Sequence, residues 1–209
     1  MAKPRTPLRR SPLAHRQNLE GTKGAVRIEE RPFLGKLILR ARPEEAVEPL
    51  RAALGLGLPF DPLTSATSGD ISALWMGPDE WMLVTTEDAL TDCEAKARAA
   101  LAGLHHQLVE VSDYYTIIAI AGPQARALLM KLTALDVHPR AFRAGMVAGS
   151  VFAHQNALLW QPLDADDDAF QLVVRWSMAD YLWCAIAEAG REWGVPEETP
   201  VKGETLTIG

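Results

Sequence analysis

The chain has 209 residues, of which 48% are hydrophobic, and a formal net charge of −6. This apolar content excludes wholesale disorder, and no apolar run approaches the roughly 18 residues of a membrane-spanning helix. The charge is uneven, because residues 1–23 carry a net charge of +5, which leaves −11 for the rest of the chain. An acidic body argues against nucleic acid as a partner, since phosphate binding needs a basic face.

The cysteine content and the start of the chain indicate a compartment. Cys93 and Cys184 are the two cysteines, and they form no closely spaced pair. Reduced thiols in the cytoplasm are therefore expected. No apolar segment follows Arg9 and Arg10, so no secretory signal is predicted, whereas an arginine-rich transit peptide stays open as an alternative.

The first half of the chain predicts an extended arm followed by strands and helices. Pro43 favours the first turn of a helix, and the Gly-Leu-Gly-Leu-Pro run at 55–59 ends it. The expected elements are an arm over 1–23, strands over 24–30 and 34–41, a helix over 43–54, a loop over 60–72, strands over 73–76 and 81–85, and a helix over 88–104.

In this half the stretch Leu-Trp-Met-Gly-Pro-Asp-Glu-Trp at 74–81 places two carboxylates between two tryptophans. Asp79 and Glu80 could be a catalytic acid pair or a charged turn. The run Gly-Pro-Asp-Glu suits a type I turn with Pro78 at its second position. A turn tip gives a carboxylate neither the burial nor the partner that shifts its pKa, so a hairpin turn is the preferred interpretation.

The second half repeats the order of elements in the first. Strands are expected over 108–112, 115–121, 147–153, 157–162 and 170–175, with helices over 123–132 and 178–193. The predicted fold is α+β, with two β-α-β-β-α lobes built on antiparallel or mixed sheets. The expected divisions are the basic arm 1–23, a first lobe over 24–107, a second lobe over 108–195 and a C-terminal tail over 196–209.

Motifs that carry chemistry are almost absent, and no glycine-rich nucleotide loop follows a strand. Gly122-Pro123 starts a helix better than it holds an anion, because proline lacks an N–H group. Four aspartates at 164 and 166–168 lack the glycine and closing glutamate of a calcium loop. His105 and His106 are adjacent, so they do not share one helix face as zinc ligands do. We therefore predict no catalytic, cofactor-binding or metal-ligating residue on this chain.

Three residues are candidates for contact with a partner. Trp183 lies roughly 120° from the centre of the apolar stripe of the last helix, which favours either an interface anchor or a residue at the edge of the core. Arg9 and Arg10 can make forked hydrogen bonds to carboxylates, so the arm is expected either to dock on an acidic neighbour or to be a solvated tail.

Several motifs together resemble one family. They are Ser11-Pro12-Leu13, Leu56-x-Leu58-Pro59, the 74–81 block, Val111-Ser112, Gly-Pro-Gln-Ala-Arg at 122–126, Leu135-Asp136 and Ala-Asp-Tyr-Leu-Trp at 179–183. In this order they resemble the gamma subunit of heterotetrameric sarcosine oxidase, whose fold is similar to the folate-binding domain of the glycine-cleavage aminomethyltransferase. An Arg-Thr pair expected within 147–156 is missing, and Trp176 stands where serine is usual.

The resemblance implies a non-catalytic subunit. It implies alpha, beta and delta subunits as partners, in a complex that oxidises sarcosine to glycine with FAD, FMN and NAD and passes the one-carbon unit to tetrahydrofolate, with no nucleic acid or membrane involved. Two alternatives stay open. One is a self-standing tetrahydrofolate-binding or aminomethyl-transfer protein, for which Glu110 or Asp113 beside Ser112 is the candidate region. The other is a homo-oligomeric scaffold.

Overall fold

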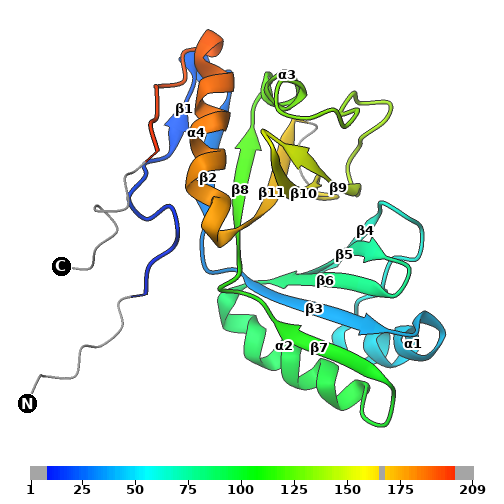
Figure 1. Cartoon of the computed structure of the whole chain (residues 1–209). Helices are drawn as coiled ribbons and strands as arrows, with labels where there is room; N and C mark the ends of the chain where they lie inside the picture. The colour runs from blue at the N-terminus through cyan, green and yellow to red at the C-terminus, as the bar shows by residue number, and fades with distance from the viewer. Residues whose placement is uncertain (1–8, 165–167, 201–209) are drawn as a thin grey trace, which may run out of the picture.

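Two antiparallel β-sheets, each covered by helices on one face, form the chain in the computed structural model, which describes residues 9–164 and 168–200. In Figure 1 the five-stranded sheet lies below, with α1 and α2 beneath it, and the six-stranded sheet stands above, with α4 along its outer face. This arrangement confirms the predicted α+β class.

The strands of each sheet come from distant parts of the chain. The six-stranded sheet has the order β1 (Leu19–Glu20), β2 (Arg27–Arg31), β8 (Tyr115–Ala121), β11 (Ala169–Arg175), β10 (Gln155–Trp160) and β9 (Val147–Phe152). The five-stranded sheet has the order β4 (Ser65–Ser68), β5 (Ile71–Gly77), β6 (Glu80–Thr85), β3 (Gly35–Ala41) and β7 (His106–Glu110).

The helices begin where their sequences supply a start signal. α1 (Pro43–Leu54) has proline in its first turn and ends at Gly55, whose φ of 66° is a left-handed conformation that glycine adopts without strain. α2 (Glu87–Ala100) is capped by Thr86, whose Oγ1 accepts a hydrogen bond from the N–H of Ala89 at 3.3 Å. α3 (Ala125–Met130) is short, and α4 spans Ala179–Gly190.

The sheets divide the chain differently from the expected lobes. The strand predicted at 24–30 is β2, and it pairs with β8 in the six-stranded sheet, not with β3. The strand predicted at 108–112 is β7, and it pairs with β3 in the five-stranded sheet. The assignment of these two strands to the lobes 24–107 and 108–195 was therefore wrong, because strand pairing joins residues that local sequence patterns do not connect.

Apolar side chains form three layers. One lies between the six-stranded sheet and α4, and a second lies between the five-stranded sheet and its helices. The third lies between the two sheets, where Leu74, Met82 and Val84 meet side chains of the six-stranded sheet such as Val147 and Val173. The two sheets therefore share one apolar layer.

The basic arm is only partly an arm. Leu13 is 2% exposed and lies in the core beneath α4, and Leu19 begins the two-residue strand β1. The side chain of Arg16 binds Asp180 of α4 and Glu198, and it donates to the carbonyl of Thr199 at 2.8 Å. Residues 9–20 thus pack on the body, and so does the described start of the predicted tail. Residues 1–8 and 201–209 of these two segments lie outside the described residues.

Candidate functional site

A groove opens beside the apolar layer between the sheets. Its volume is about 430 Å³, and it runs along the six-stranded sheet from the edge strand β9 to β8. The floor and rim come from both sheets, and the lining residues are Met76, Met82, Tyr115, Gly149, Ser150, Val151, Asn156, Ala157, Leu158, Val173 and Arg175. The groove is mainly apolar, and Arg175 at its rim supplies a positive charge.

Lys36 of β3 is the one basic side chain in the described part of the chain that is almost fully buried, at 1% exposure. Its Nζ donates to the carbonyl oxygens of Leu34 at 2.5 Å and Ser112 at 3.3 Å. Burial lowers the pKa of Lys36 to about 8, although the nearby carboxylates of Asp113, Glu30 and Glu110 favour its charged form. The sequence analysis did not single out this residue. Lys36 stands two residues before Ile38, so both side chains lie on the same face of the strand, and this spacing was a usable signal that Lys36 faces an apolar layer.

Asp79 and Glu80 form the predicted turn. Asp79 lies between β5 and β6 with its side chain 55% exposed, and it pairs with Arg40 at 3.2 Å. Its carbonyl accepts a hydrogen bond from the N–H of Ala41 at 3.1 Å, which ties the turn to the end of β3. An exposed ion pair of this kind contributes little to stability, about 0–1 kcal/mol.

Changing Asp79 to Asn and Glu80 to Gln together is therefore expected to leave the turnover of the complex that the resemblance implies within about threefold, because a turn tip supplies no acid–base chemistry. The free energy of unfolding should change by less than about 1 kcal/mol. Steady-state kinetics and denaturant titration measure both quantities. A drop of 100-fold or more in turnover with assembly intact would contradict this interpretation and make the pair catalytic.

The adjacent histidines lie beyond the end of α2. α2 ends at Ala100, and His106 is the first residue of β7. His105 and His106 line an open depression of about 510 Å³ with Arg40, Arg42 and Asp79. In the part of the chain that the structure describes, no group of three or more histidine, cysteine, aspartate or glutamate residues could hold a metal ion.

The start of α3 is closed to an anion. Gly122 has a φ of 115°, and a Cβ atom at this position would lie 2.8 Å from the carbonyl oxygen of Ala25. The N–H of Gln124 donates to the same carbonyl at 3.0 Å, so the backbone donors here already have partners. In the acidic loop, Asp168 pairs with Arg126 at 3.6 Å, whereas Asp166 and Asp167 lie outside the described residues.

The three candidates for partner contact have different surroundings. Trp183 is 1% exposed and packs in the core beneath α4, so of the two alternatives for this residue the core position holds and the surface anchor does not. Arg9 pairs with Glu87, and its guanidinium lies 4.3 Å from the centre of the Phe33 ring. Arg10 is exposed.

The candidate region for folate chemistry is open to solvent. Glu110 and Asp113 are exposed and line a shallow depression of about 490 Å³ with Val111, Ser112 and Tyr114. Among the described residues, no helix is long and apolar enough to cross a membrane.

Paired antiparallel sheets with helices on their outer faces are shared with a known class of proteins. A crystal structure of the glycine cleavage system aminomethyltransferase from Bartonella henselae matches 78% of this chain and 46% of that protein, with a TM-score of 0.59 and 16% identity. The chain therefore has an aminomethyltransferase-like fold. More specifically, residues 41–192 match the sarcosine oxidase, gamma subunit family, and the chain belongs to that family.

Two further similarities agree with the family. The sarcosine oxidase subunit gamma of an Arthrobacter species is 35% identical over 162 residues, which are 75% of this chain and 78% of that protein. A chain of the heterotetrameric sarcosine oxidase from Corynebacterium sp. U-96 matches with a TM-score of 0.81 and 27% identity, over 91% of this chain and 99% of that one.

Proposed function

We propose that this chain is the gamma subunit of a heterotetrameric sarcosine oxidase and acts there as a non-catalytic accessory subunit. The observation that carries the proposal is the match to a chain of such an enzyme over nearly the full length of both chains. The exposure of the candidate carboxylates Glu110 and Asp113 supports a structural role.

In this proposal the other subunits, named alpha, beta and delta, hold the cofactors. FAD, FMN, NAD and tetrahydrofolate belong to the whole complex, and the gamma chain holds none of them. The complex oxidises sarcosine to glycine in the cytoplasm. The gamma chain contributes to assembly, and its exposed basic residues Arg9 and Arg10 are candidates for contact with an acidic neighbouring subunit.

Co-purification tests the assembly. When the tagged chain is expressed with the three other subunits, all four are expected to elute together with bound flavin, while the chain expressed alone should show no flavin absorbance. In the same experiment Arg10→Glu should weaken association at low salt, and added salt should shrink the difference from wild type. Arg9→Gln tests the second candidate and is expected to have the smaller effect, because the Arg9 guanidinium already has Glu87 as a partner.

Two results would contradict the proposal. Elution of the tagged chain without the other subunits would contradict its role as an accessory subunit. Saturable binding of tetrahydrofolate by the isolated chain, measured by calorimetry, would favour the self-standing folate-binding alternative. If the Arg10→Glu variant assembles like wild type at every salt concentration, Arg10 does not contact a neighbouring subunit, and the rest of the proposal stands.

A further inference from the structure

Strand β9 is a free sheet edge without a charged side chain. Its sequence is Val-Ala-Gly-Ser-Val-Phe, and it ends the six-stranded sheet. Exposed edges pair readily with other chains, so proteins usually protect them with charges, prolines or very short strands. Three other edges of this molecule are protected in such ways. β1 has two residues, β4 has four, and β7 carries the charged Glu110, while the carbonyl of its Leu108 accepts a hydrogen bond from Arg98.

The register of β9 shows which backbone groups are free. The N–H of Val147 donates to the carbonyl of Leu63, so it points away from β10. Since the direction alternates along an antiparallel strand, Gly149 and Val151 also direct their N–H and C=O groups outward. Both residues are exposed, and their backbone groups form no hydrogen bond outside the sheet within the described residues. Two complete donor–acceptor pairs are therefore available to another strand.

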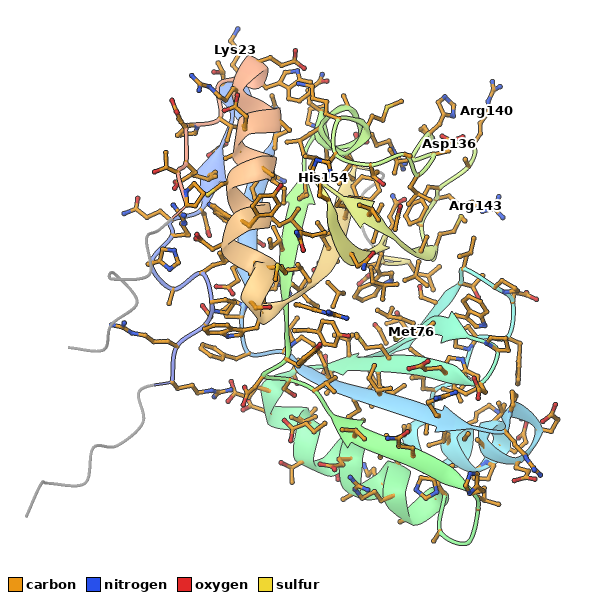
Figure 2. The ribbon with its side chains drawn as sticks, viewed as in Figure 1. Lys23, Met76, Asp136, Arg140, Arg143 and His154 are labelled. Carbon is orange, nitrogen blue, oxygen red and sulfur yellow. The ribbon has the colours of Figure 1, made fainter. Side chains whose placement is uncertain are left out.

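The apolar groove lies directly beside this edge. Gly149 and Val151 line it together with Leu158, Met76 and Met82. Met76, labelled in Figure 2, belongs to the five-stranded sheet and packs against the layer between the two sheets. A strand added along β9 would place every second side chain over the groove, because side chains alternate between the two faces of a sheet. The edge offers backbone hydrogen bonds, and the groove offers apolar contact.

Two exposed apolar side chains lie near the start of β9. Leu63, 41% exposed, belongs to the loop whose carbonyl accepts a hydrogen bond from Val147, and Leu163, 55% exposed, lies against Gly145. Leu63 has a φ of 63°, a left-handed conformation that is rare for a bulky residue and that costs of order 1–3 kcal/mol. Its carbonyl is the one bonded to Val147, so the strained loop is attached to the free edge.

The charges around the edge specify the chemistry of the occupant. Arg175 of β11 is aligned with Val151 of β9 in the sheet, with β10 between them. Arg140 and Arg143 lie in the loop before β9. Figure 2 shows the side chains of Arg140 and Arg143 extending outward from this loop. None of the three forms an ion pair with a carboxylate among the described residues. Three arginines on an otherwise acidic body favour an occupant with acidic residues at its ends.

We propose that the free edge of β9 and the groove beside it form the docking surface for an extended segment of a partner subunit, which joins the six-stranded sheet as a seventh strand. The segment carries apolar residues at alternate positions and acidic residues at its ends. This inference rests on the proposed function, since the occupant belongs to another subunit of the complex. Main-chain hydrogen bonds supply affinity in this type of contact, and the groove supplies specificity.

Charge substitutions on the edge test the inference in the complete complex. Val151→Glu and Gly149→Glu each place a carboxylate at the apolar groove, and both are expected to weaken association with the other subunits at least about tenfold. A Cβ atom at Gly149 would meet no atom within 4 Å, so the substitution leaves the fold intact. Val109→Glu is the matched control, because Val109 is also an exposed valine on an edge strand, at 40% against 51% for Val151.

Hydrogen exchange supplies a second readout that does not depend on a variant. The amides of Gly149 and Val151 should exchange rapidly in the isolated chain and become protected in the complex, whereas the amide of Ser150, which faces β10, should be protected in both.

Three outcomes would overturn the inference while leaving the proposed function in place. They are wild-type affinity of both glutamate variants, an equal loss in Val109→Glu, and unchanged exchange at positions 149 and 151 on assembly. If the isolated chain forms a dimer that Val151→Glu dissociates, a second copy of the chain occupies the edge. This result would overturn the inference that a segment of a partner subunit binds there. Failure of the wild-type chain to join the complex would instead contradict the proposed function.

Discussion

Replacing Trp183 with alanine is expected to lower the free energy of unfolding by about 3–5 kcal/mol, the range typical of truncating a large aromatic side chain in a core. Trp183 is 1% exposed and belongs to the apolar cluster between α4 and the six-stranded sheet. Trp176→Ala is the matched comparison. Trp176 is 43% exposed at the start of the same segment, and its loss should cost less than about 1 kcal/mol.

Trp183→Phe separates packing from polarity. The Nε1 of Trp183 is buried and has no hydrogen-bond partner among the described residues. Phenylalanine keeps most of the ring volume and removes this unpaired donor, so its cost should be well below that of alanine. Denaturant titration of the isolated chain measures all three variants. Equal stability of Trp183→Ala and wild type would mean that the side chain does not pack in the core and would restore it as a surface residue.

The helical pattern alone could not decide between the two alternatives for Trp183. The periodicity of 178–193 predicts one apolar stripe and leaves Trp183 on a second face. In the structure the buried stripe of α4 is instead Ala179, Leu182, Trp183, Ile186, Ala187 and Gly190, which follow steps of three and four residues, so Trp183 faces the six-stranded sheet. Because α4 is apolar on most of its sides, its sequence alone does not fix which stripe faces the sheet.

Elements with strong local signals were predicted well. The helix expected over 43–54 is α1, and the strand expected over 115–121 is β8, each with the same bounds. Both have local causes, namely proline in a first helical turn and a β-branched apolar run. β4 was missed because Ser-Ala-Thr-Ser contains no large apolar residue, and its pairing with β5 holds it in place.

The candidate sites were less predictable than the elements. The turn at Asp79 follows from four consecutive residues, so sequence reasoning was sufficient there. The groove draws residues from β5, β6 and four strands of the other sheet, and only the tertiary structure brings them together. Lys36 is buried because the six-stranded sheet and residues 110–113, which connect β7 to β8, cover the face of β3 that carries its side chain. This too is a contact between segments that are distant in the sequence.

The burial of Lys36 predicts a pH-dependent stability difference. Its pKa is lowered to about 8 in the folded chain, below the ordinary lysine value of 10.5. Between these values the unfolded chain binds more protons than the folded chain, so the contribution of Lys36 to stability rises with pH. Below about pH 8 both states are protonated, and the folded state carries the full cost of a buried ammonium group, about 3 kcal/mol by the size of the shift.

Comparison with Lys36→Met isolates this contribution. Burial also raises the pKa values of Cys93, Cys184 and Tyr115, which makes stability fall at high pH, but these groups are present in both proteins and cancel in the difference. From pH 7 to pH 10 the stability of wild type should therefore rise relative to that of Lys36→Met by about 2–3 kcal/mol.

Urea titrations at half-unit pH steps measure the difference. Lys96→Met is the control, because its exposed ammonium group has a pKa raised by the hydrogen bond to Asp92 and should show no such rise. A difference between wild type and Lys36→Met that stays constant from pH 7 to pH 10 would mean that Lys36 is solvated in the folded chain. Water would then reach the apolar layer between the sheets at the end where β3 contacts residues 110–113. Solvent is the remaining source of hydrogen-bond acceptors that could stabilise the charged ammonium group of Lys36 there.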